Sequence, residues 1–104
     1  MENDPNLGTV PQENVEGDID KILEQRGNRY GDFKTHAKIT QQLKAMMMQG
    51  PSFRTLTTSQ WEALEMIAHK IGRIVNGDPS YEDSWDDIAG YAKLVADELR
   101  GDIK

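Results

Sequence analysis

The segment WEALEMIAHKIGRIVNGDPSYEDSWDDIAGYAKLVADEL, residues 61–99, decides the fold. In its first half, apolar residues recur at the three- and four-residue spacing of one helix face: Leu64, Ile67, Ala68, Ile71, Ile74 and Val75. In its second half, the same spacing gives a second stripe: Trp85, Ile88, Ala92, Val95 and Leu99. Only the short polar connection NGDPS separates the stripes, and such a connection makes neighbouring helices antiparallel. The segment therefore predicts a long antiparallel helical hairpin with both stripes in the core.

The first helix of this hairpin has a start signal. Thr57 as the N-cap makes Gln60 the partner of a capping box, in which each side chain bonds the other residue's backbone. Ser59 as the N-cap would give the same task to Glu62. We favour Thr57, because Leu56 can then pack against Trp61 as a hydrophobic staple. Glu62 is thereby left free for another role.

Two further helices are expected upstream. One runs from about Asp32 to Gln49, ends at Gly50-Pro51 and buries an apolar side: Phe33, Ala37, Leu43, Met46 and Met47. A shorter one in GDIDKILEQRG ends at Gly27 and carries Ile19, Ile22 and Leu23. Residues 1–16 show no apolar periodicity and read as a flexible N-terminal tail. The prediction is an all-α, small four-helix domain over residues 17–104, with the shorter helix pair packed across the hairpin.

Composition limits the classes of function. The chain has 104 residues, a net charge of -6 and no cysteine, which excludes disulfides and thiolate metal sites. Its acidity opposes direct nucleic-acid binding, and no apolar run is long enough for a membrane span. A domain this small buries little of its surface, and Tyr91 and Leu94 lie off the main core stripe. We therefore expect a soluble, intracellular homo-oligomer.

Two pairs of carboxylates are candidates for a metal site. Glu62 and Glu65 are three residues apart, hence neighbours on one helix face. Asp83 and Asp87 are one turn apart and in line with Tyr91 and Leu94, on a face that we expect to be covered. Two ionised carboxylates on such a face need a cation, which Arg73, Lys70 or Mg²⁺ could supply.

A simpler interpretation explains the same acids without a ligand. Acidic residues in the first turn stabilise a helix through its dipole, and this accounts for Glu82 and Asp86. Aspartate–arginine pairs between helices also need no metal. Gly72 and Gly90, both inside helices, indicate close approach of a neighbouring helix or a bound group. His36 and His69 lie on polar flanks, as surface histidines do, and Tyr30 or Asp32 can cap the second helix.

The segments RYGDF, EALEMIAHKIGRIVNGDPS and DSWDDIAGYAKL resemble sequences in a family of small phage and prophage helical proteins. This resemblance implies a phage-encoded protein that acts in the cytoplasm of the bacterial host. More distantly, the chain resembles the all-α nucleoside triphosphate pyrophosphohydrolases of the MazG-like and dimeric dUTPase group. Their pattern, E-x-x-E followed by E-x-x-D, holds magnesium between helices and serves hydrolysis between the α and β phosphates. Glu62 and Glu65 match the first pair; Asp83 with Asp86 matches the second, with aspartate in place of glutamate, so Asp87 is an alternative partner of Asp83.

The leading hypothesis is a Mg²⁺-dependent, pyrophosphohydrolase-like protein of nucleotide metabolism. In it, Glu62 and Glu65 are catalytic, and the metal ligands are Glu62, Glu65, Asp83 and Asp87. Phosphates are held by Lys70 and Arg73, while Tyr91 or Trp85 borders the base. One alternative is a non-catalytic protein that sequesters a nucleotide as an anti-defence device, and another is an acidic inhibitor that binds a host protein.

Overall fold

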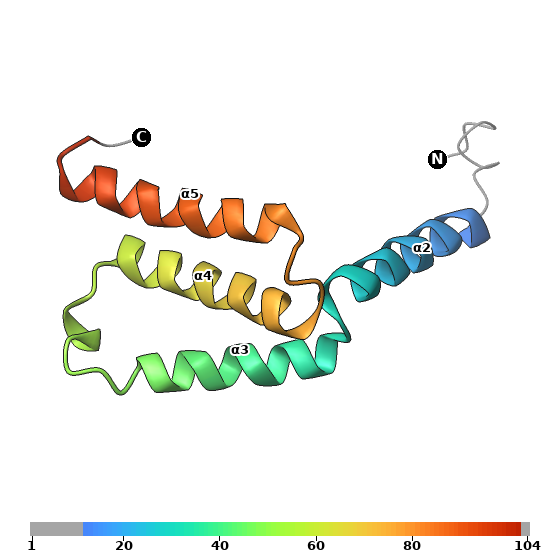
Figure 1. Cartoon of the computed structure of the whole chain (residues 1–104), viewed down its shortest axis with the longest axis horizontal. Helices are drawn as coiled ribbons and strands as arrows, with labels where there is room; N and C mark the ends of the chain where they lie inside the picture. The colour runs from blue at the N-terminus through green and yellow to red at the C-terminus, as the bar shows by residue number, and fades with distance from the viewer. Residues whose placement is uncertain (1–11, 103–104) are drawn as a thin grey trace.

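The computed structural model describes residues 12–102, with side chains from residue 17 onward. Four α-helices and one short 3₁₀ helix follow one another: α2 (Gln12–Tyr30), α3 (Phe33–Met47), η1 (Phe53–Thr55), α4 (Thr58–Asn76) and α5 (Glu82–Leu99) (Figure 1). No strand occurs among these residues, which confirms the all-α prediction. No helix in the described part of the chain is long and apolar enough to cross a membrane.

The helices α3, α4 and α5 lie side by side, with α4 in the middle (Figure 1). The predicted antiparallel hairpin of α4 and α5 is confirmed, and α3 packs antiparallel along the other side of α4. A helix in the centre of such a layer has two covered sides and two open ones. One side of α4 faces the corner between α2 and α3. This side carries the polar residues that form the site described below.

Local capping signals set where the helices begin. The Thr57 hydroxyl accepts a hydrogen bond from the Gln60 amide at 3.1 Å, and the Thr57 amide donates to Gln60 Oε1 at 2.9 Å. This reciprocal pair is the predicted capping box. At the start of α3, the Asp32 carboxylate accepts from the Thr35 amide at 2.9 Å, so Asp32 is the N-cap.

The helix α2 differs from the prediction at both ends. It begins at Gln12, so residues 12–16 of the predicted tail are helical, and residues 1–11 lie outside the described part. It also passes through Gly27, where we predicted its end, and stops at Tyr30 before Gly31, whose φ of 77° favours glycine. A glycine inside a helix costs only about 1 kcal/mol, which contacts of Tyr30 with α4 can offset. Only the C-terminal end of α2 meets the other helices, so α2 projects and does not pack across the hairpin (Figure 1).

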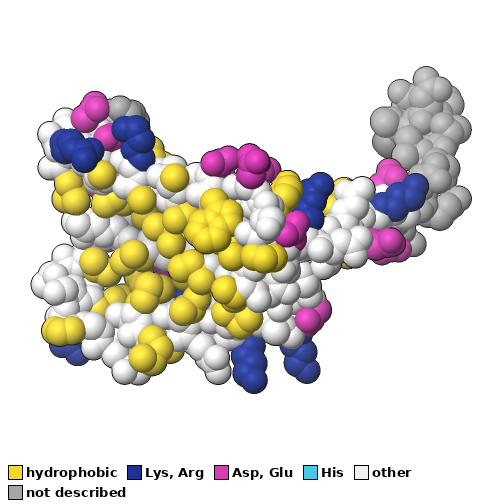
Figure 2. Space-filling view, viewed as in Figure 1, with side chains coloured by type: hydrophobic (Ala, Val, Ile, Leu, Met, Phe, Trp, Pro, Cys, Tyr) yellow, Lys and Arg dark blue, Asp and Glu magenta, His cyan; other side chains and the backbone are white. Residues whose placement is uncertain are grey.

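The apolar core is smaller than the stripes predict. Among the described residues, the buried apolar side chains are Ala63, Ala68 and Ile74. Several residues predicted for the core are more than half exposed: Phe33, Met46, Val75, Trp85 and Leu99. The reason is the single layer, because an apolar stripe that continues past the neighbouring helix faces solvent. Figure 2 shows apolar side chains gathered on one face over α3, α4 and α5.

Candidate functional site

The corner between α2 and α3 is tied to the end of α4. Asn76 Nδ2 donates to the backbone oxygens of Tyr30 at 2.7 Å and of Asp32 at 3.0 Å. The Asp78 amide donates to the Arg29 carbonyl at 2.5 Å. These bonds hold the Tyr30 ring over α4, where the Arg73 guanidinium lies 4.1 Å from the ring centroid.

A cavity of about 540 Å³ opens where α2, α3 and α4 meet, and we call it the three-helix cavity. It is lined by Leu23, Arg26, Gly27, Tyr30, Gly31, Asp32, Phe33, His36, His69 and Arg73. Two guanidinium groups against one carboxylate leave this lining with a net positive charge, although the whole chain is acidic. Within the described residues, neither Arg26 nor Arg73 forms an ion pair.

Two histidines meet at the inner wall of the three-helix cavity. His36 Nε2 lies 3.2 Å from His69 Nδ1, so the two nitrogens share one hydrogen bond. His36 is only 5% exposed and packs against Gly72 together with the buried Thr40. A Cβ atom on Gly72 would lie 2.5 Å from Thr40 Cγ2 and 3.0 Å from the His36 ring. Close helix approach at Gly72 is thereby confirmed. At Gly90, no described atom beyond the adjoining residues and the helix's own backbone lies within 4 Å of an added Cβ, so no neighbouring helix explains that glycine.

Both imidazoles are neutral at pH 7. Burial lowers the pKa of each ring, and the positive charge of Arg73 lowers it further. For His69 the resulting pKa is about 4, with smaller contributions from His36, Lys70 and Lys44. The Gly72 backbone acts in the opposite direction on the pKa of His36, yet His36 Nδ1 finds no hydrogen-bond partner of acceptable geometry in the described part of the chain.

The first predicted carboxylate pair lies next to this cavity. Glu62 and Glu65 line a groove of about 250 Å³, the carboxylate groove, together with Lys44, Met66 and His69. Glu65 Oε2 lies 3.5 Å from Lys44 Nζ of α3. Because His69 lines both hollows, the carboxylate groove and the three-helix cavity meet at this residue.

The second predicted pair lies on another side of α4. Asp87 Oδ2 is 2.8 Å from Lys70 Nζ, so Lys70 is the cation that Asp87 requires, and Lys70 is itself buried. Asp83 is exposed and accepts from the Tyr81 hydroxyl at 3.0 Å. The expectation that Asp83 and Asp87 face a covered region is wrong for the single chain, because both acids are exposed and Leu94 in the same line is 51% exposed.

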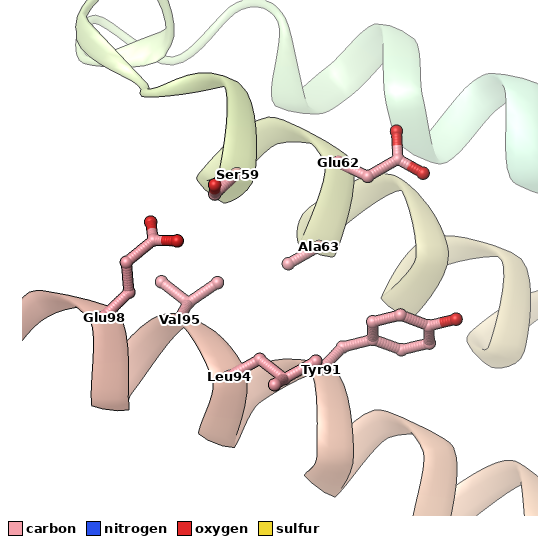
Figure 3. A pocket seen from close by; sticks show the side chains of 7 residues that line it. All are labelled: Ser59, Glu62, Ala63, Tyr91, Leu94, Val95 and Glu98. Atoms are coloured by element: carbon pink, nitrogen blue, oxygen red, sulfur yellow. The ribbon is translucent and has the colours of Figure 1, made fainter. Parts of the chain in front are cut away.

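The residues predicted to border a base do not line the three-helix cavity that contains Arg73. Tyr91 lies across a cleft of about 290 Å³ from Glu62, with one wall from α4 and the other from α5 (Figure 3). The Tyr91 phenol and the Glu62 carboxylate extend toward the same end of this cleft (Figure 3). The Trp85 indole donates to the Pro79 carbonyl at 2.8 Å, which ties the start of α5 to the preceding connection.

The four predicted metal ligands do not fit one Mg²⁺ ion in this chain. No three histidine, aspartate or glutamate side chains of residues 17–102 lie close enough together to hold a metal ion. Glu65, Asp83 and Asp87 each have a different partner, namely Lys44, Tyr81 and Lys70. What remains together is the pair Glu62 and Glu65 in the carboxylate groove.

The fold and the cavity define a small all-α protein in which cationic and aromatic side chains line a hollow beside a histidine pair. The chain belongs to the family described as "Domain of unknown function (DUF6378)", which matches residues 18–99. Comparison with curated proteins and with solved structures gave no match. The family match covers α4, α5 and α3 completely, and it includes all residues that line the three-helix cavity.

Sequence reasoning found Arg73 but missed its surroundings in the three-helix cavity. The sequence pattern assigns no role to Arg26, indicates Tyr30 only as a helix cap and predicts both histidines at the surface, where His36 in fact is buried. One usable signal was Gly72, since a glycine inside a helix marks the point where another helix comes close. To predict that Gly72 lies against the histidine of α3, one must know how far α3 and α4 are shifted along each other. No local sequence pattern gives this shift.

Proposed function

We propose that the three-helix cavity binds a nucleotide and that the protein acts by holding this ligand. The observation that carries the proposal is the pair of guanidinium groups, free of carboxylate partners in the described part of the chain, beside aromatic rings in one cavity. Arginine binds phosphate oxygens through parallel N–H donors. In a chain with net charge -6, such a concentration of cations calls for an anionic ligand.

The aromatic side chains supply a place for the base. Phe33 lines the cavity, with its ring centroid 6.1 Å from that of His36, and it is 78% exposed, which is unusual for a large apolar side chain. Tyr30 offers a second ring, with Arg73 stacked on it. Stacking engages the guanidinium face and leaves its N–H groups, which lie in the plane, available to a phosphate. Stacking of a base on an aromatic side chain contributes about 1–3 kcal/mol.

A Mg²⁺-dependent pyrophosphohydrolase is the second candidate function. Its support is the Glu62–Glu65 pair, which opens on a groove that meets the three-helix cavity at His69. Because the four predicted ligands do not come together in one chain, we derive no hydrolytic step from this arrangement. Binding without hydrolysis is the function that the cavity supports best.

Calorimetric titration of a nucleotide panel, with and without Mg²⁺, tests the proposal. Arg26→Gln removes one exposed guanidinium from the cavity, and Arg54→Gln removes another exposed guanidinium from η1 as a matched control. A charged hydrogen bond is worth roughly 1.5–3 kcal/mol, so Arg26→Gln should weaken binding by about tenfold or more. Arg54→Gln should leave the Kd unchanged. Equal effects of both substitutions, or no binding of any nucleotide, would exclude the cavity as the site.

The same titrations separate the two candidate functions. If the nucleotide is recovered intact after incubation with Mg²⁺, the protein is a binding protein. If pyrophosphate is released and Glu62→Gln or Glu65→Gln abolishes the release, the pyrophosphohydrolase prediction is confirmed instead.

A further inference from the structure

The two histidine side chains are placed so that, when both are neutral, one proton bridges a nitrogen of each ring. His36 Nε2 and His69 Nδ1 face each other at 3.2 Å with ring planes at 84°. If one nitrogen donates, the other must accept, so at least the accepting ring is neutral. The lowered pKa of both rings makes the second ring neutral as well at pH 7. The contact with Gly72 holds His36 at the wall of the three-helix cavity, and the His69 imidazole forms no other hydrogen bond within the described residues. The pair is therefore a single unit with room for one more proton.

The charges around the pair oppose that second proton while the cavity is empty. The cations that face it are Arg26 of α2, Lys44 of α3 and Lys70 and Arg73 of α4. The anions are Asp32 at the start of α3 and, in the carboxylate groove, Glu62 and Glu65 of α4. Asp32 is occupied by the Thr35 amide, Glu65 lies beside Lys44, and on the α5 side Asp87 is paired with Lys70. Glu62 has no ion-pair partner among the described residues, and Asp32 keeps its charge, so the pair has two guanidinium groups and two carboxylates around it. Of these groups, Arg73 is the one that lowers the pKa of both imidazoles.

An anion in the cavity reverses this balance. A phosphate held by Arg26 and Arg73 would place negative charge beside the two imidazoles and offset the repulsion from Arg73. We propose that the His36–His69 pair takes up one proton when the three-helix cavity binds its anion, so that ligand capture is proton-coupled. This inference rests on the proposed function, and it assigns the pair as the group that regulates the same site. The protonated pair adds an N–H donor and a positive charge at the cavity wall.

The direction of the pH dependence follows from linkage. In the free protein the pKa of His69 is about 4, and the bound anion raises it. Between these two pKa values the complex carries one proton more than the free protein, so affinity increases as the pH falls. Within that interval the Kd should change by at most about tenfold for each pH unit. Above the pKa of the bound form, the coupling should vanish.

Calorimetry of wild-type protein in two buffers of different ionisation enthalpy measures the proton uptake directly. We would titrate ATP and, separately, sulfate, which keeps its two negative charges throughout this pH range and so contributes no proton of its own. The expected uptake is largest at pH values between the pKa of the free protein and that of the complex, and it falls toward zero near pH 8. His69→Asn keeps a hydrogen-bonding group near the position of Nδ1 but cannot be protonated, so its binding, whatever the affinity, should lose the proton uptake.

Each outcome of this experiment decides the matter. Proton uptake by wild type that is absent in His69→Asn supports the proposal, and the buffer comparison on wild type stands even if the variant fails to fold. Binding of ATP and sulfate without uptake at any pH overturns the coupling and leaves the proposed function intact. No binding of either anion at any pH overturns the proposed function and the coupling together.

Discussion

The substitution Gly72→Ala tests the packing that brings the two histidines together. The added methyl group would lie 2.5 Å from Thr40 Cγ2 and 3.0 Å from the His36 ring, so side chains or helices must move apart. Overpacking of this kind costs about 1–3 kcal/mol. Alanine has a helix propensity that is better by about 1 kcal/mol, which offsets part of the cost. We expect a net loss of stability of about 1–2 kcal/mol, since Thr40 and His36 are both 5% exposed and have little room to move.

Urea unfolding followed by circular dichroism measures this change, and Gly90→Ala is its matched control. Gly90 also lies inside a helix, but nothing among the described residues lies within 4 Å of its added Cβ. That substitution should stabilise the protein by about 0.5–1 kcal/mol. In a Thr40→Ser background, which removes the nearest methyl group, Gly72→Ala should lose most of its destabilising effect. A Gly72→Ala protein as stable as Gly90→Ala would refute the close approach of α3 and α4.

Three further predictions concern charge, pH and association. Asp87→Asn leaves the buried Lys70 ammonium without its partner and should destabilise the fold by about 1–3 kcal/mol. Asp86→Asn, at an exposed position, should change stability by less than about 0.5 kcal/mol. Urea unfolding midpoints measure both changes. Because the pKa of His69 is lowered in the folded protein, the unfolded chain binds more protons than the folded chain between pH 4 and 6.5. Stability should therefore be constant above pH 6.5 and decline toward pH 4. His69→Asn should flatten this dependence in the same assay. We expect a homo-oligomer that covers the exposed apolar face, so sedimentation should show a dimer or larger species that Val75→Lys dissociates.

Each of these predictions has an outcome that would contradict it. Equal midpoints for the two aspartate variants would mean that the Lys70–Asp87 pair contributes nothing to the fold. Stability that rises as the solution is acidified from pH 6.5 would show that His69 gains protons on folding, opposite to the direction of its lowered pKa. A compact monomer in sedimentation at high concentration would leave the exposed apolar face of the layer unexplained.

The helix starts could be predicted because their causes are local. The capping box of Thr57 and Gln60 and the N-cap Asp32 depend on side chains within three residues of the backbone groups they satisfy. The end of α2 could not be predicted in the same way. Gly27 is a common stop signal, but contacts with Asn76, over 40 residues away in sequence, secure the backbone beyond it.

The candidate site was predicted less well because it depends on which helix faces meet. The alternation of apolar and polar residues indicates one covered face for each helix, yet a middle helix such as α4 has two covered sides. The sequence left Arg73, Lys70 and Mg²⁺ open as counter-charges for Asp87, and the geometry selects Lys70. His36 and His69 are 33 positions apart, and their contact depends on the register that the Gly72 packing sets.

The measurement that tests the central claim most directly is a nucleotide titration followed by NMR of the two imidazoles and the indoles. The protein has two histidines, so His69→Asn assigns both imidazole signals. With ATP in the three-helix cavity, the signals of His36 and His69 should move with saturating dependence on ligand, and the Trp85 indole signal should stay in place. Movement of the Trp85 signal while both imidazole signals remain unchanged would place the nucleotide at α5 and contradict the account.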